Sequence, residues 1–167
     1  MDNKMRISFK KPEPAKFENK IINCSCDSKE ARGAGIFVDF AWFTDHTQTI
    51  RVSDNPNEPS QIAQVALYGL QAGDEIWLNG LFHADSNNLQ STPDLQVTIL
   101  KNGTAIYQQL LRLDTDQGDD LVPIPVQTVD IQSTAGPAIY TLAVSANVPN
   151  VEVFDEKTLT ATVIRRS

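Results

Sequence analysis

The sequence contains few of the features that mark catalytic, membrane-spanning or disulfide-stabilised proteins. It has no apolar run near the roughly 20 residues that span a bilayer, and only two cysteines and two histidines among 167 residues. Neither histidine belongs to a motif, so His46 is interpreted as an exposed loop residue and His83 as a half-buried strand residue. No nucleophile elbow, phosphate-binding glycine loop or zinc-binding helix motif occurs. We therefore expect no enzymatic activity, no cofactor and no membrane partner.

The N-terminal residues are polar and basic, and they lack the apolar core of a secretory signal. We expect the chain to be synthesised in the cytoplasm without a signal peptide. Residues 1–32 hold eight basic and five acidic side chains (+3), whereas the rest of the chain holds six basic and 16 acidic (−10). An acidic body repels phosphate, so nucleic acid is excluded as a partner. A basic arm on an acidic body suits contact with another copy, although a merely soluble tail explains the arm equally well.

Residues 1–34 are predicted to form an irregular arm, because the Lys-Lys-Pro-Glu-Pro stretch disfavours a helix. The local alternation of Ile7, Ser8 and Phe9 is typical of a segment that can add a strand to the edge of a sheet. The apolar residues that the arm offers for docking are Ile7, Phe9, Phe17, Ile21 and Ile22.

Cys24 and Cys26 lie in this arm with one residue between them. Two cysteines cannot form a closed zinc site within one chain, and a disulfide between residues two apart would be strained. The pair is suited to cross-linking neighbouring copies, or it consists of reduced thiols without a role.

From residue 35 to residue 167 the chain is predicted to fold as one β-sandwich. Short alternating segments are separated by Gly, Pro, Asn and Asp, and no helical periodicity is present. The expected strands are 36–42, 47–52, 61–70, 75–84, 94–101, 104–113, 121–128, 138–145 and 158–165. Eight or nine strands at this spacing favour an all-β fold, a single two-sheet sandwich of jelly-roll type.

Two local signals refine this prediction. Asn102-Gly103 is the turn sequence of a type I′ hairpin, which pairs Lys101 with Thr104 and Ile99 with Ile106. Continuing this register would place Gln108 opposite Val97, so we expect a bulge or an edge position near Gln108. Two prolines, at 123 and 125, cannot donate ladder hydrogen bonds, which places the segment 121–128 at an edge or makes it irregular.

The loop after residue 113 concentrates carboxylates that could act as oxygen ligands for Ca²⁺. These candidates are Asp114, Asp116, Asp119 and Asp120. Their spacing does not match an EF-hand, so a solvated acidic loop is the favoured interpretation. Trp42, Trp77, Phe82 and Tyr107 could stack on a sugar, although the strand alternation favours core positions for Trp42 and Trp77.

The run Val97–Tyr107, the pair Val129-Asp130, and the segments 139–144 and 159–164 resemble the exosporium protein C type of spore-surface protein. That family has a similar order of an I-x-(R/K)-(N/D) hairpin, a (V/I)-D turn, a Y-T-L strand and a closing (L/F)-x-A strand. The resemblance implies a non-enzymatic β-sandwich on the outside of bacterial endospores.

The cysteine-bearing arm is similar to the connectors of endospore appendage subunits, whose jelly-roll bodies are bridged through N-terminal cysteines. It departs from them in its greater length and in its Cys-x-Cys spacing. The leading hypothesis is a self-assembling structural subunit of a spore surface layer or appendage, with copies of itself and other spore-surface proteins as partners. The alternative is an adhesin-like or carbohydrate-binding jelly roll, including a phage-particle protein.

Overall fold

The regular structure of the described part of the chain is entirely β-strand. The computed structural model describes residues 35–86, 92–113 and 122–166. Nine strands lie in these ranges: β1 (Gly35–Asp45), β2 (Ile50–Arg51), β3 (Ser60–Leu70), β4 (Glu75–Ser86), β5 (Asp94–Lys101), β6 (Thr104–Arg112), β7 (Val122–Ile131), β8 (Gly136–Ala146) and β9 (Val151–Arg166). The predicted all-β class is confirmed. A helix long and apolar enough to cross a membrane is not found among these residues.

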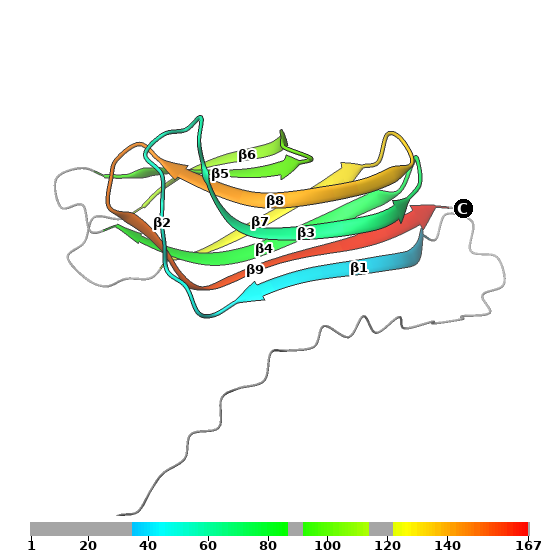
Figure 1. Cartoon of the computed structure of the whole chain (residues 1–167), viewed down its shortest axis with the longest axis horizontal. Helices are drawn as coiled ribbons and strands as arrows, with labels where there is room; N and C mark the ends of the chain where they lie inside the picture. Colours follow the sequence, from blue (N-terminus) through cyan, green and yellow to red (C-terminus); the bar gives the residue numbers. More distant parts are fainter. Residues whose placement is uncertain (1–34, 87–91, 114–121, 167) are drawn as a thin grey trace, which may run out of the picture. The chain divides into compact units, whose positions relative to one another are not determined.

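The strands form two antiparallel sheets that pack on each other (Figure 1). Sheet A has the order β1-β9-β4-β7, with the short β2 also paired to β9, and sheet B has the order β3-β8-β5-β6. Apart from β2, the pairing is nested: β1 with β9, β3 with β8, β4 with β7, and β5 with β6. Successive pairs alternate between the two sheets. This eight-stranded, two-sheet arrangement is a jelly roll, as predicted.

The core lies between the sheets and follows the two-residue period of the strands. In β4, Ile76, Leu78 and Phe82 are buried against sheet B. Gly80 lies on the same inner face where space is short, since a Cβ atom there would lie 3.2 Å from Leu142 Cδ2. The side chains of β4 that alternate with these point away from sheet B and form part of the outer face of sheet A.

Several expected strands differ in extent from those observed, among them the segments expected at 158–165 and 47–52. Strand β9 begins at Val151, well before the predicted start at residue 158, and the predicted strand 47–52 is reduced to β2. The first half of β9 contains charged residues, which have low strand propensity. This half nevertheless pairs with β2 and with the end of β4, so tertiary pairing overrides the local preference.

Strand β7 is an edge strand, as its prolines predicted. It pairs with β4 alone, and Pro123 and Pro125 lie opposite His83 and Leu81. An edge position leaves one side of the strand without ladder partners, so the missing N–H groups cost no hydrogen bond there.

The β5–β6 hairpin has the predicted turn but a different register. Asn102 and Gly103 both have positive φ, at 49° and 83°, and Lys101 pairs with Thr104. The predicted pairing of Ile99 with Ile106 is wrong, because Ile99 pairs with Tyr107. The expectation of a bulge or an edge position near Gln108 is confirmed, because β6 is an edge strand and a bulge lies two residues before Gln108, at Ile106. The physical effect of the bulge is to turn Gln108 outward, so that Tyr107 faces the core side instead.

Candidate functional site

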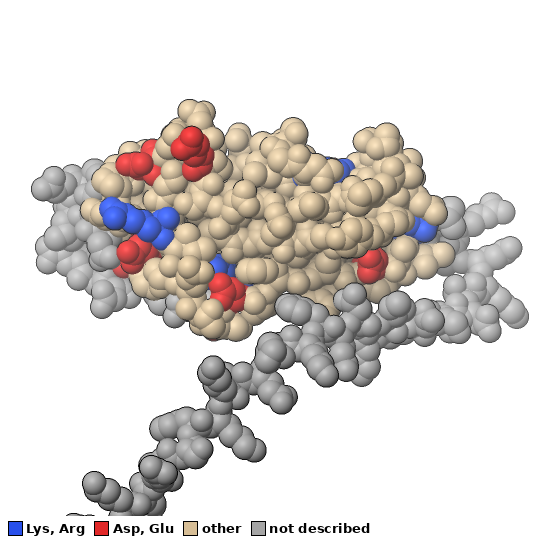
Figure 2. All heavy atoms as spheres, in the orientation of Figure 1, with Lys and Arg blue, Asp and Glu red and all other residues tan. Residues whose placement is uncertain are grey.

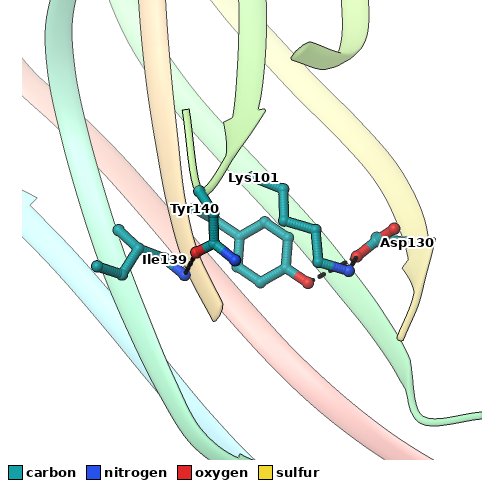
Figure 3. A network of polar contacts seen from close by, with 5 residues as sticks. Lys101, Asp130, Ile139 and Tyr140 are labelled. Atoms are coloured by element: carbon teal, nitrogen blue, oxygen red, sulfur yellow. Dashed lines mark hydrogen bonds and ion pairs between the residues drawn. The ribbon is translucent and has the colours of Figure 1, made fainter. Parts of the chain in front are cut away.

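A polar cluster closes one end of the sandwich (Figure 3). Asp130 Oδ2 accepts hydrogen bonds from Lys101 Nζ at 2.6 Å and from Tyr140 Oη at 2.7 Å. The Lys101 ammonium also lies 5.9 Å from the centre of the Tyr140 ring. Asp130 belongs to sheet A and the other two residues to sheet B, so the cluster joins the two sheets.

The phenol of Tyr140 acts as a hydrogen-bond donor in this cluster. Burial raises the pKa of Tyr140, and the hydrogen bond to Asp130 raises it further. The hydroxyl therefore stays protonated at neutral pH and donates to Asp130. The adjoining turn is attached to β8 as well, because the Ile139 N–H donates to Asn102 Oδ1 at 2.8 Å.

Two further ion pairs fix the connections between strands. Both carboxylate oxygens of the buried Asp74 accept hydrogen bonds from Arg165 at 2.7 Å. Lys157 is 1% exposed, and its Nζ lies 2.9 Å from Asp45 Oδ2 and 2.6 Å from the Gln48 carbonyl oxygen. These pairs hold the β3–β4 turn to β9 and the end of β1 to β9. These two ion pairs are therefore explained by their role in holding the fold together.

The calcium candidates and the docking and cysteine residues of the arm belong to segments outside the described part of the chain. Asp114, Asp116, Asp119 and Asp120 lie outside the described residues, as do Cys24, Cys26 and the arm positions Ile7, Phe9, Phe17, Ile21 and Ile22. Within the described ranges, three or more His, Cys, Asp or Glu residues do not gather into a group that could hold a metal ion. His46 is exposed, with Nδ1 4.0 Å from Glu156, and His83 is partly buried on β4.

The outer face of sheet A exposes large apolar side chains. Nine of the thirteen exposed large hydrophobic side chains of the described residues belong to strands of sheet A. The strand register puts seven of them on one face, since directly paired residues point to the same side. These seven residues, hereafter the apolar face, are Phe37, Phe40, Trp42, Trp77, Leu81, Val129 and Ile131.

The core positions expected for Trp42 and Trp77 are therefore wrong. Trp42 is 60% exposed and Trp77 is 51% exposed, and both point away from sheet B. Phe82 is fully buried, so it cannot stack on a ligand, and Tyr107 is half-buried. Of the four candidates for stacking on a sugar, the two tryptophans are therefore the ones that are exposed.

A signal in the sequence could have identified the outward tryptophan of β4. The positions that alternate with Trp77 are apolar or glycine from Ile76 to Ala84, whereas Trp77 and Leu81 share their face with the polar residues Glu75, Asn79 and His83. A face that mixes polar residues with one tryptophan is the solvent side of a strand. For β1 the signal is absent, because a bulge between Phe37 and Asp39 interrupts the alternation.

Comparisons with known proteins give only distant likenesses. No protein-family model matches the chain, and no curated protein sequence matches it. Among solved structures, the EclA C-terminal domain, described as a sugar-binding protein, is similar at 16% identity and a TM-score of 0.35, over 86% of this chain and 89% of that one. The VP2 subviral particle of infectious bursal disease virus is similar at 15% identity and a TM-score of 0.39, over 93% of this chain and 42% of that one.

A third similar structure is latent PorU from Porphyromonas gingivalis, at 9% identity and a TM-score of 0.42, over 83% of this chain and 14% of that one. The chain thus spans less than half the length of the VP2 and PorU chains. These likenesses assign no function to it, and the jelly-roll architecture follows from its own strand order.

Proposed function

We propose that the chain is a non-enzymatic structural subunit that assembles with copies of itself. The observation that carries this proposal is the apolar face on sheet A. Monomeric soluble proteins rarely expose contiguous apolar patches of more than a few hundred Å², and larger patches mark interaction sites. The charged clusters of the described residues are used in joining strands, so this face is the feature that the fold itself does not explain.

The N-terminal arm adds a second contact between subunits. It enters the folded body at Gly35, the first residue of the edge strand β1. Its charge of +3 complements the −10 of the remaining chain, which favours attraction between the arm of one copy and the body of another. The resemblance to exosporium and appendage proteins supports a bacterial spore surface layer as the location, with other spore-surface proteins as further partners.

The test is the size of the purified protein in solution. Sedimentation velocity at increasing concentration is expected to reveal oligomers, and electron microscopy then distinguishes a filament, ring or lattice. Deleting residues 1–34 is expected to reduce the oligomer size while circular dichroism still reports a folded β-protein. A full-length protein that stays monomeric up to high concentration would contradict the proposal.

A second candidate function is carbohydrate binding, and the exposure of Trp42 and Trp77 favours it. Tryptophan rings on a flat sheet can stack on the apolar faces of sugars. A glycan-array screen tests this candidate, with Trp42→Ala and Trp77→Ala as the informative variants. Leu110→Ala, which truncates an exposed apolar side chain of β6 in sheet B, is the matched control. Binding that survives both tryptophan changes would remove this candidate.

A further inference from the structure

We propose that the apolar face of sheet A is covered by the same face of a second copy, related by a two-fold axis that runs along the strands between β9 and β4. This inference rests on the proposed self-assembly and names the surface and the partner. It is independent of the arm.

The centre of the face has no charge. Residues of this face that pair directly across β1, β9, β4 and β7 form rows that run across the strands. The three successive rows that begin at Phe40, Trp42 and Thr44 of β1 contain no Asp, Glu, Lys, Arg or His. Glu75 and Arg166 lie just outside this set of rows. Their charges neutralise each other, because Arg166 Nη2 lies 2.6 Å from Glu75 Oε1. Ordinary protein surfaces carry charges of both signs throughout. An uncharged area of this kind is typical of the centre of an interface.

The apolar face has a self-complementary shape, with two ridges and a valley between them. Phe40 and Trp42 stack on β1 with ring centres 5.8 Å apart, and they form one ridge. Trp77 and Leu81 form a second ridge on β4. Strand β9 lies between β1 and β4 and presents only short threonine side chains in these rows. Because neighbouring strands are about 4.8 Å apart, the ridges are separated by a valley about 10 Å across.

Two of the three threonines of the valley have satisfied hydroxyl groups. Thr160 Oγ1 donates to the Asn79 carbonyl oxygen at 3.2 Å, and Thr158 Oγ1 donates to the Leu81 carbonyl oxygen at 3.5 Å. Their methyl groups can therefore accept an apolar partner without loss of a hydrogen bond. A two-fold axis between β9 and β4 places the β4 ridge of each copy over the β9 valley of the other.

The same axis places the β1 ridge of each copy over β7 of the other. There Phe40 and Trp42 meet the exposed side chain of Val129. Both sets of contacts occur twice, as an isologous interface requires. Aligned packing of the two outer sheets about 10 Å apart is the ordinary geometry of stacked sheets.

Charge and area both favour a second copy as the occupant. Two bodies of −10 repel each other, and an uncharged face is where they can approach with the least repulsion. Figure 2 shows acidic side chains in red and basic side chains in blue on one side of the body. The width of four neighbouring strands is roughly 19 Å, and the length of the 11-residue strand β1 is roughly 36 Å, so the outer face of sheet A covers about 700 Å². A stable interface takes about 800 Å² from each partner.

The test introduces a positive or a negative charge at Asn79. This residue is exposed in the middle row, next to the proposed axis. In Asn79→Lys or Asn79→Asp alone, like charges from the two copies meet across the axis, and we expect the dissociation constant to rise about 100-fold. An equimolar mixture of the two variants pairs opposite charges and is expected to recover to within about tenfold of the wild type.

The readouts are sedimentation equilibrium and intrinsic fluorescence of the full-length chain. The only two tryptophans of the chain lie on this face, so association should shift their emission to the blue. The matched controls are Gln108→Lys and Gln108→Asp, at an exposed position on the outer face of sheet B. These controls are expected to leave association unchanged.

Each outcome bears on the proposal. Association that survives both Asn79 variants would overturn this interface while leaving self-assembly intact. Variants that dissociate without recovery on mixing would also overturn it, because the arm or a different molecule would then be the occupant. A wild-type chain that is monomeric, with fully exposed tryptophans, would overturn both this inference and the proposed function.

Discussion

Single side chains on β4 distinguish the inner face, which packs in the core, from the outer face, through which we propose that copies associate. Phe82 fills the core and is fully buried, whereas Trp77 points outward from the same strand and is half exposed. Removing a buried ring leaves a cavity that the surrounding side chains fill only in part. Removing an exposed ring leaves no cavity, so the two aromatic residues should respond differently to truncation.

We predict that Phe82→Ala lowers the free energy of unfolding by about 3–5 kcal/mol. Trp77→Ala is expected to change it by less than about 1 kcal/mol, because surface substitutions seldom cost more. Urea denaturation, at a concentration low enough to avoid oligomers, measures both values. Equal losses in the two variants would contradict the assignment of the inner and outer faces.

Asp45 gives the fold a dependence on acid pH. The hydrogen bond from Lys157, followed by those from Thr47, holds the pKa of Asp45 at about 2, below its ordinary value of 3.8. A depressed carboxyl pKa stabilises the folded state above the unfolded value, and this stabilisation disappears as the pH falls through the folded value. The relevant window is therefore from about pH 4 down to about pH 2.

We predict that Asp45→Asn flattens the dependence of Tm on pH in this window. The variant also has a lower Tm at pH 7, because it leaves the buried Lys157 ammonium without its carboxylate. Asp39→Asn removes an exposed carboxylate from the same strand and serves as the control. Thermal melts between pH 7 and pH 2.5 provide the measurement. Parallel Tm profiles for the wild type and Asp45→Asn would rule out this contribution.

At the scale of strands and turns, the β5–β6 hairpin shows what local sequence can specify. The type I′ turn requires positive φ at two successive positions, and Asn-Gly satisfies both at low cost. A β-branched residue at Gly103, where φ is 83°, would be strained although no atom lies within 4 Å of its Cβ position.

We expect Gly103→Val to lower the free energy of unfolding by about 1–2 kcal/mol. Ala105→Val adds the same side chain two residues later, within the exposed strand β6, and is expected to be neutral or slightly stabilising. Chemical denaturation of the two variants side by side separates backbone strain from the added volume. A Gly103→Val variant as stable as Ala105→Val would remove the strain argument.

The sequence could predict turns and edge strands because their causes are local. Asn102-Gly103 and the prolines of β7 each impose a backbone constraint that no distant contact can relieve. Bulges are different, because the extra residue is placed by the partner strand. The mismatch at Gln108 indicates a bulge nearby but not its position at Ile106, and no local signal marks the bulge after Phe37, so the outward face of β1 does not follow from alternation alone.

At the scale of the whole molecule, we propose that Cys24 and Cys26 of the arm make the proposed assembly covalent. Thiols stay reduced in the cytoplasm and can form disulfides after release into oxidising surroundings. Lys20, Lys29 and Arg32 lie near the pair in the sequence and favour the reactive thiolate. A bond between subunits avoids the strain of joining residues two apart.

We predict that oxidised protein forms a ladder of multimers on non-reducing gels and that a reductant collapses the ladder. The double variant Cys24→Ser, Cys26→Ser should give no ladder, yet it should keep its association in sedimentation experiments. Oxidised wild-type protein that migrates only as a monomer would leave assembly to non-covalent contacts.

The position of β9 has a consequence for how the protein is made. This strand lies between β1 and β4 in sheet A, yet the ribosome produces it after the other eight. Strand β1 pairs with β9 alone, and Gly35 finds its partner only when Arg166 has been synthesised. Pairing over such sequence separations is slow, and unpaired apolar strands invite aggregation. Sheet A therefore cannot be completed before β9 has been synthesised, and its earlier strands lack their central partner until then.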